Sequence, residues 1–332
     1  MNPSHGLEPS VLVAGGAGYI GSHTCKALKA AGYLPVTLDN LATGYRQAVK
    51  WGPLFEADVR DAEAVREAIR AYRIKAAIHF AAFSLVGESV RDPGKYYDNN
   101  VGAGVTFAQT LIASGVSALV FSSTAATYGV PSVSPIPEDH PTAPINPYGA
   151  SKLAFEGALR WLGEAHPFRW TALRYFNAAG ADADGEIGES HEPETHLIPN
   201  LCKAVVGTGP ALTVFGQDYP TPDGTPIRDY IHVTDLAEAH VIAIRRLIEG
   251  ADSGIFNVGT GEGATVMQII GAAEAALGQR VPYTVGPRRA GDPPSLVADP
   301  TRLKATFGWE PRCSDLETII RTAARWQRER PY

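Results

Sequence analysis

The sequence is poor in cysteine, which limits disulfide bonds as a source of stability and indicates the redox state of the protein's compartment. Its 332 residues include only three cysteines, Cys25, Cys202 and Cys313, which are odd in number and widely spaced. That pattern argues against a disulfide framework and fits a reducing compartment, so we expect a cytoplasmic protein. No cysteine or histidine cluster has zinc-ligand spacing, and we therefore expect no metal site.

Other absences exclude whole classes of protein. No apolar run approaches the roughly 20 residues that a membrane helix needs, and residues 1–10 lack the charged and apolar blocks of a signal peptide. The formal net charge is −6 with both signs interspersed, so we expect binding neither to nucleic acid nor to a membrane. There is also no internal repeat and no low-complexity tract.

What is present is an alternation of short apolar runs with helical patterns. We expect strands near residues 11–14, 36–38, 55–57, 76–80 and 118–121, and helices near 22–31, 61–72 and 96–114. Repeated strand–helix units predict a parallel sheet with helices on both faces. Ligands of such sheets bind at the carboxyl ends of the strands, where we expect Asp39, Asp58, Phe80 and Thr124.

The first expected strand runs directly into a glycine-rich turn. Gly15, Gly18 and Gly21 follow a G-x-x-G-x-x-G pattern between a strand and a helix. Glycines permit a tight turn and the close approach of a pyrophosphate, which then binds at the helix N-terminus. Asp39 follows about 20 residues on, where a carboxylate accepts hydrogen bonds from a ribose diol and repels a 2′-phosphate. We therefore predict bound NAD; Asp39 can also form an Asx-type turn with Asn40.

Residues 148–152 read Tyr-Gly-Ala-Ser-Lys and open an expected helix after a proline-rich crossing at 131–147. Tyr148 and Lys152 then share one helix face. The ordinary pKa of a phenol is about 10 and a neighbouring ammonium lowers it, so the spacing suits a proton-transfer pair for oxidising an alcohol. A surface tyrosine stacked on a lysine stem would have the same spacing. Thr124 would flank the substrate hydroxyl from the other side.

The second half of the chain has a looser pattern. We expect helices near 198–206, 233–249 and 315–330, with Thr234 as a helix N-cap, and strands near 212–215 and 254–258. The expected fold is α/β, a Rossmann-type doubly wound parallel sheet with a smaller α/β substrate-binding lobe. The Rossmann domain would cover residues 11–176 and take back 231–256, and the lobe would comprise 177–230 and 257–330.

Seven segments carry a family resemblance, and they follow one another in the expected order. They read GGAGYIGSH (15–23), DNL (39–41), GES (87–89), YYDNNV (96–101), YGASK (148–152), LRYFN (173–177) and RDYIHV (228–233). Together they resemble the UDP-glucose 4-epimerase (UDP-galactose 4-epimerase) family of the extended short-chain dehydrogenases/reductases. The resemblance covers residues 11–326.

The resemblance implies reversible epimerisation of UDP-glucose and UDP-galactose through a transient 4-keto intermediate, with tightly bound NAD. Tyr148 would take the proton of the sugar 4-hydroxyl and Thr124 would hydrogen-bond the reacting oxygen. Lys152 would bind the nicotinamide ribose and hold Tyr148 in its basic form. The resemblance also implies a role in galactose or exopolysaccharide precursor metabolism, and a homodimer packed through helices around residues 96–114 and 148–166.

The resemblance implies two sets of binding residues. The cofactor contacts would be Gly15, Gly18, Tyr19, Ile20, Gly21, Asp39, Asn40, Asp58, Val59, Phe80, Ala81, Ala82, Asn99, Tyr148, Lys152 and Phe176. The residue pattern independently indicates the glycines, Asp39 and the strand-end residues, whereas Asn99 and Phe176 come from the resemblance alone. By resemblance, the substrate contacts are Thr124, Tyr148, Asn177, His196, Leu197, Phe215, Arg228, Tyr230, Arg289, Asp292 and Leu296. Among these, Arg228 and Arg289 would hold the diphosphate, Asp292 the uridine ribose and Phe215 the uracil.

Three positions depart from the pattern of many relatives and leave the sugar open. Ser84 stands where many relatives have a cofactor-binding lysine, His196 replaces an asparagine, and Leu296 replaces a bulky tyrosine beside the sugar 2-substituent. A smaller residue at 296 could admit an N-acetyl group, and Thr-His-Leu at 195–197 also occurs among pentose epimerases. A 4-epimerase of UDP-N-acetylglucosamine or of UDP-xylose/UDP-arabinose is therefore the alternative.

Three other functions have less support. A 4,6-dehydratase carries an Asp-Glu pair after the threonine, where this chain has Ala125 and Ala126. A net reductase would need exchangeable cofactor, usually NADPH, which Asp39 disfavours. A non-catalytic NAD-binding protein could keep the glycine turn, but it would have no need to keep Thr124, Tyr148 and Lys152 together.

Overall fold

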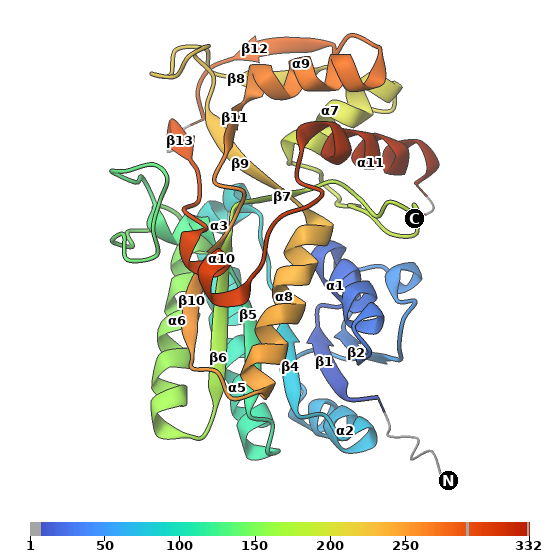
Figure 1. Cartoon of the computed structure of the whole chain (residues 1–332), viewed down its shortest axis with the longest axis vertical. Helices are drawn as coiled ribbons and strands as arrows, with labels where there is room; N and C mark the ends of the chain where they lie inside the picture. Colours follow the sequence, from blue (N-terminus) through green and yellow to red (C-terminus); the bar gives the residue numbers. More distant parts are fainter. Residues whose placement is uncertain (1–7, 290–291, 331) are drawn as a thin grey trace.

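Seven parallel strands form the main sheet of the computed structural model, which describes residues 8–289, 292–330 and 332 (Figure 1). Their order is β10-β6-β5-β4-β1-β2-β3. The chain reverses its direction of winding between β1 and β4, and a ligand of such a sheet binds at that point. The bounds are β1 Ser10–Ala14, β2 Leu34–Asp39, β3 Leu54–Glu56, β4 Ala76–His79, β5 Ala118–Thr124, β6 Arg169–Tyr175 and β10 Gly254–Val258.

Helices bury both faces of this sheet, and the apolar residues of β1 show why. Leu12 lies in one hydrophobic core, whereas Val11 and Val13 lie in the other, on the opposite face. The first core is closed by α2 (Ala62–Tyr72), α5 (Gly104–Ala113) and α6 (Pro147–Ala165). The second is closed by α1 (Tyr19–Ala30), α8 (Val233–Ile248) and α10 (Thr301–Phe307). The predicted doubly wound α/β fold is confirmed.

A smaller lobe lies beyond one end of the sheet, at the top of Figure 1. One of its sheets comprises β7 (Asn177–Ala179), β9 (Ile227–His232), β11 (Gly263–Thr265) and β13 (Ser295–Leu296), and a second pairs β8 (Leu212–Phe215) with β12 (Tyr283–Gly286). A third core joins α7 (Leu197–Val206), α9 (Val266–Leu277) and α11 (Leu316–Glu329). β10 returns to the main sheet after the first strands of the lobe, so elements of the sheet and of the lobe alternate along the chain.

Three local expectations were wrong. α1 begins at Tyr19, so the glycine turn is shorter than expected. The single helix expected over 96–114 is divided: α4 (Pro93–Tyr96) leads into a π-helix, Tyr97–Ala103, before α5. The N-cap of α8 is His232, whose Nδ1 accepts a hydrogen bond from the N–H of Thr234 at 3.1 Å. Thr234 already lies in the first turn, where its own hydroxyl cannot cap the helix.

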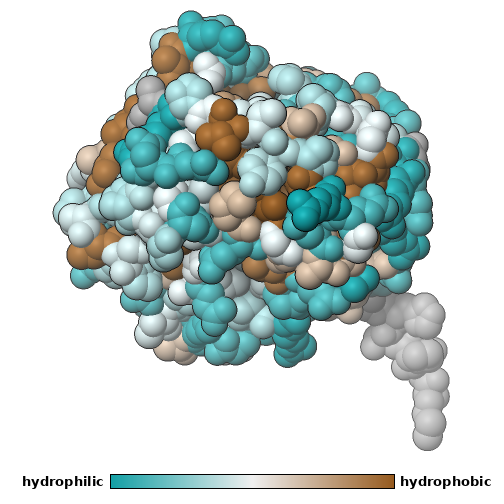
Figure 2. Space-filling view, turned by 90° about the horizontal axis from the view of Figure 1, so that it is seen from above, coloured by the Kyte–Doolittle hydropathy of each residue, from teal (hydrophilic) through white to brown (hydrophobic). Residues whose placement is uncertain are grey.

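The structure shows the state of the cysteines and the character of the helices and of one face of the surface. All three cysteines are free thiols. Among the helices of the described residues, none has both the length and the apolar character needed to cross a membrane. Figure 2 looks down on the lobe, and hydrophobic residues appear there as small groups scattered among hydrophilic ones.

The closing helix α11 supplies a test of the lobe's core. Ile320 is 0% exposed in the third core, so Ile320→Ala should lower the free energy of unfolding by about 2–5 kcal/mol through lost burial and a residual cavity. Ile248→Ala, at the end of α8 where the side chain is 47% exposed, should change it by less than about 0.5 kcal/mol. Urea denaturation followed by circular dichroism measures both; equal midpoints would contradict this packing.

Candidate functional site

The turn between β1 and α1 depends on close backbone contacts. Gly15 has a φ of +82°, and a Cβ there would lie 2.6 Å from the backbone nitrogen of Ala81. A Cβ on Gly21 would lie 2.1 Å from the carbonyl oxygen of Gly15. α1 begins after Gly18 with no side-chain cap and no acidic residue in its first turn. Its N–H groups and positive dipole end are therefore suited to a pyrophosphate.

Asp39 lies beside this turn at the end of β2. Its Oδ2 accepts a hydrogen bond from the N–H of Ala17 at 2.9 Å, and its Oδ1 accepts one from the N–H of Leu41 at 2.8 Å. The second bond forms the expected Asx-type turn across Asn40. Burial raises the pKa of the Asp39 carboxyl, and the two backbone donors oppose that rise. Asn40 Nδ2 donates to Asp58 Oδ2 at 2.9 Å, which joins the ends of β2 and β3.

The segment after β4 closes the other side of the glycine turn. The backbone nitrogens of Phe80 and Ala81 donate to the carbonyl of Ala14 at 2.7 and 3.1 Å. Ala82 follows, Val59 is buried after β3, and Ser84 is exposed. The turn, the uncapped helix and the strand-end acid together fit the dinucleotide NAD.

Asn100 is a residue that sequence reasoning missed. Its Oδ1 accepts from the N–H of Phe83 at 3.0 Å, and its Nδ2 donates to Ser151 Oγ at 3.1 Å. The neighbouring Asn99, a predicted cofactor contact, donates to Asn100 Oδ1 at 3.1 Å. Both belong to the π-helix, a feature frequent at functional sites. Hydrophobic periodicity gave no signal for it, because that pattern does not distinguish a π-turn from an α-turn.

The three predicted catalytic side chains meet where β5 ends. Thr124 is the last residue of β5, and Tyr148 lies in the first turn of α6, capped by Asn146. Thr124 and Tyr148 are both buried, each with 8% of its surface exposed, and the Thr124 side chain lies close enough to act on the pKa of the Tyr148 phenol. Lys152 is 3% exposed, and its Nζ donates to the carbonyl of Ser122 at 2.8 Å. The surface-tyrosine alternative is therefore excluded.

Burial controls the protonation of this group. It raises the pKa of Tyr148, and the nearby Thr124 side chain opposes that rise. It lowers the pKa of Lys152 to about 7, against the attraction of Glu156. The expectation that Lys152 lowers the phenol's pKa is therefore wrong for the protein side chains alone. The amine points at the Ser122 carbonyl and carries only part of a charge at neutral pH, so desolvation of the phenolate prevails.

A buried ion pair joins α6, the helix that carries Tyr148 and Lys152, to β6, and sequence reasoning missed it too. Glu156 accepts hydrogen bonds from Arg174 Nε at 2.9 Å and Nη2 at 2.6 Å. Their side chains are 2% and 4% exposed. Ser123, next to Thr124 in β5, donates to the same carboxylate. A signal was available in the sequence, because Glu156 and Arg174 each lie within an apolar segment. Charged residues are rarely buried without a partner, so two such residues indicate a buried ion pair.

Several predicted substrate residues gather around β9 and β13. Leu296 and Phe176 pack against a small cluster that includes Ala125, the residue after Thr124. In the strand pairing, Leu296 lies opposite Arg228 and Asn177 lies opposite Tyr230. At Leu296 the lobe therefore packs against the cluster that directly follows β5.

The charged residues of the lobe interact with one another. Arg228 forms an ion pair with Asp292, although the resemblance assigned them to different parts of the nucleotide. The Arg289 guanidinium lies 4.2 Å from the centre of the Phe215 ring, in a cation–π contact. Burial raises the pKa of Tyr230 to about 12, so this phenol stays neutral.

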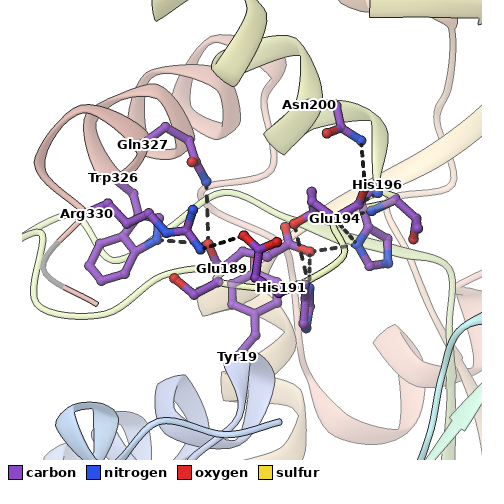
Figure 3. A network of polar contacts seen from close by, with 12 residues as sticks. Tyr19, Glu189, His191, Glu194, His196, Asn200, Trp326, Gln327 and Arg330 are labelled. Carbon is purple, nitrogen blue, oxygen red and sulfur yellow. Dashed lines mark hydrogen bonds and ion pairs between the residues drawn. The ribbon is translucent and has the colours of Figure 1, made fainter. Parts of the chain in front are cut away.

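His196 and Leu197 have different surroundings. The Nδ1 of His196 lies 2.9 Å from Glu189 and 2.8 Å from Glu194, in the cluster that Figure 3 shows. Its side chain is 43% exposed, and only that outer part could reach a ligand. Leu197 begins α7 and packs against the third core.

A glycine turn for a dinucleotide, joined by one sheet to a buried tyrosine and threonine, defines an NAD-dependent enzyme that acts on a hydroxyl group. The model of the NAD dependent epimerase/dehydratase family matches residues 11–259. The chain belongs to this family. It is 47% identical to the UDP-glucose 4-epimerase of Lacticaseibacillus casei over 97% of this chain and 98% of that protein.

Two further relatives agree with this assignment. The UDP-glucose 4-epimerase of Rhizobium meliloti (strain 1021) is 49% identical, again over 97% of this chain and 98% of that protein. The crystal structure of UDP-glucose 4-epimerase from Brucella ovis in complex with NAD is 50% identical, with a TM-score of 0.93. The match covers 96% of this chain and 98% of that one. NAD is therefore the cofactor that both the site and a solved relative indicate.

The role of Asp39 can be tested through cofactor affinity. Asp39→Asn keeps the size of the side chain but removes the charge that a ribose diol would bond, so we expect weaker NAD binding by about 1.5–3 kcal/mol, or about 10- to 150-fold. Calorimetry on protein freed of NAD measures this. Asp98→Asn, with 76% of the Asp98 side chain exposed, is the control; equal affinities for the two variants would contradict the assignment.

Proposed function

We propose that this chain is a UDP-glucose 4-epimerase, which interconverts UDP-glucose and UDP-galactose through a transient 4-keto sugar with tightly bound NAD. The observation that carries the proposal is the meeting of Thr124, Tyr148 and Lys152 at the end of β5. Its relatives at 47–50% identity bear that name over nearly their whole length.

The side chains divide the work at the sugar 4-position. Tyr148 takes the proton of the 4-hydroxyl and later returns it, and Thr124 holds the reacting oxygen through a hydrogen bond. Lys152, oriented by the Ser122 carbonyl, binds the nicotinamide ribose. When bound, NAD would supply the hydride chemistry, and its oxidised form would add a positive charge beside these side chains. That charge can favour the phenolate, which the protein side chains alone do not.

The lobe would hold the nucleotide. Arg228 and Arg289 bind the diphosphate because planar guanidinium groups match phosphate oxygens. Binding would redirect Arg228 from Asp292, leaving that carboxylate for the uridine ribose, while Phe215 packs on the uracil. Asn177 and Tyr230 would complete the sugar and phosphate contacts, together with Leu197 and the exposed outer part of His196, whose Nδ1 faces Glu189 and Glu194.

The direct test is turnover without added cofactor. Purified protein given UDP-galactose and no NAD should form UDP-glucose, because the cofactor stays bound through the cycle. Product is measured by a coupled UDP-glucose dehydrogenase assay after the epimerase is removed. Inactivity towards every UDP-sugar of a panel would overturn the proposal.

Tyr148→Phe tests the proton-transfer role. Removing the hydroxyl should lower kcat by a factor of about 10² to 10⁴, while the content of bound NAD stays unchanged. Tyr97→Phe, where the wild-type side chain is 46% exposed, should turn over at the normal rate. Near-normal kcat in Tyr148→Phe would show that another group is the base.

Leu296 bears on the choice of sugar, and here the N-acetyl alternative has a specific observation in its favour. This leucine packs against the small cluster of Ala125, Tyr128 and Ile136, whose first member follows Thr124 in the chain. A tyrosine there would fill the space that a 2-acetamido group needs. We therefore expect the wild type to act on both UDP-glucose and UDP-N-acetylglucosamine.

The expected effect of Leu296→Tyr is selective. Activity towards UDP-N-acetylglucosamine should fall at least about tenfold in kcat/KM, a loss of about 1.4 kcal/mol, with UDP-glucose turnover retained. A panel that also includes UDP-xylose separates the pentose alternative. Absence of N-acetyl activity in the wild type would contradict this assignment.

We further propose a cytoplasmic homodimer packed through α6 and the helices around residues 96–114. Support comes from aromatic side chains exposed on these helices, Tyr97 at 46% and Trp161 at 69%. Light scattering after gel filtration should give twice the chain mass of 35.3 kDa if the protein is a dimer.

The division of the chain into two domains also stays a proposal. The Rossmann domain would comprise residues 11–176 with 231–256, and the substrate-binding lobe would comprise residues 177–230 with 257–330.

A further inference from the structure

Four side chains of the segment between β7 and α7 converge on one point (Figure 3). They are Glu189, His191, Glu194 and His196, and one ligand atom from each lies within 4.8 Å of all the others. The Nδ1 atoms of His191 and His196 lie 3.1 and 2.9 Å from Glu189 Oε1. They lie 3.8 and 2.8 Å from the two oxygens of Glu194.

The chemistry and spacing of these donors suit a metal ion. Two imidazoles and two carboxylates form a donor set that divalent transition metals such as Zn²⁺ accept. With bonds of about 2.0–2.2 Å, a tetrahedral ion holds its ligand atoms about 3.3–3.6 Å apart. The four distances between nitrogen and oxygen, from 2.8 to 3.8 Å, lie on either side of that range. With all four ligand atoms within 4.8 Å of one another, the cluster comes close to the spacing that such an ion requires.

Glu194 supplies a second, independent observation. Its side chain is 3% exposed, and its Oε1 accepts hydrogen bonds from the N–H groups of Thr195 and His196, both at 2.8 Å. Its Oε2 is buried and has no hydrogen-bond partner. A buried carboxylate oxygen without a partner is costly, because desolvation is not compensated. Ion pairs within the cluster explain the short distances to Oε1, but Oε2 has only the longer contact of 3.8 Å with His191 Nδ1 and no hydrogen bond.

We propose that Glu189, His191, Glu194 and His196 bind one divalent transition-metal ion, with Zn²⁺ the best match to this donor set. Four ligands from the protein form a closed set, as in structural rather than catalytic metal sites. The proposal does not depend on the epimerase reaction.

The position of the cluster indicates what the ion stabilises. The carbonyl of Glu189 accepts a hydrogen bond from Trp326 Nε1 of α11 at 2.9 Å. The His191 ring lies edge-on to Tyr19, the first residue of α1, with ring centres 6.3 Å apart. His196 is the N-cap of α7. The ion would therefore hold this segment between the closing helix, the cofactor-binding turn and the first helix of the lobe (Figure 3).

Metal titration of the full chain tests the site. Tag-free protein is treated with a chelator, dialysed, and titrated with CoCl₂ and, separately, with ZnCl₂. We expect one Co²⁺ per chain with the intense visible absorption of four-coordinate cobalt, displacement of that signal by Zn²⁺, and a higher unfolding temperature with Zn²⁺ bound. Wild-type protein without stoichiometric binding of either ion would overturn the proposal, whatever the variants do.

The matched variants are Glu194→Gln and Glu192→Gln. Glu194→Gln keeps an oxygen for the two backbone donors but removes the charged ligand, so metal affinity should fall by more than the 10- to 100-fold typical of losing an outer-shell partner. Glu192, in the same segment, has 72% of its side chain exposed, and Glu192→Gln should bind as the wild type does. Unchanged affinity in Glu194→Gln would also overturn the proposal.

Discussion

The ion pair between Glu156 and Arg174 is the interaction on which the catalytic end of the main sheet depends. It joins α6 to β6, and Ser123 ties the same carboxylate to β5. Arg174 also lies over the ring of Tyr128, whose hydroxyl donates to Asn257 in β10 at 2.8 Å. Breaking a buried pair of this kind costs about 3–5 kcal/mol, because the remaining charge has no solvent. The position of α6 relative to the strand ends is therefore tightly determined.

The position of α6 determines the protonation of Tyr148 and Lys152, which lie on this helix before Glu156. Tyr148 and Lys152 lie on the same buried face of α6, so both lose water, and each favours its neutral form. Glu156, one turn further along the helix, is the charge that opposes this loss at Lys152. Among the protein side chains alone, the Tyr148 phenol therefore stays neutral, with the Thr124 side chain beside it.

The fold and the cofactor half of the site could be predicted because their causes are local in sequence. An apolar run, a glycine turn and a helix suffice to make one strand–helix unit, and Gly15 and Gly21 leave no space for a side chain. The lobe was harder to predict. Arg228 and Asp292 are far apart in the chain and meet only because β9 pairs with β13. The π-helix at Tyr97–Ala103 was also missed, since it differs from an α-helix by one hydrogen-bond step.

The sequence by itself determined the class of fold and indicated NAD, and it predicted which residues would form the proton-transfer group, because turn geometry and helix spacing depend on near neighbours. Only the tertiary structure decided how those residues are charged, since desolvation depends on everything packed around them. It also decided that His196 belongs with Glu189, His191 and Glu194. A histidine that resembled a sugar contact in sequence is thereby placed in a cluster with metal-ligand geometry, because the loop folds four donors from within eight residues onto one point.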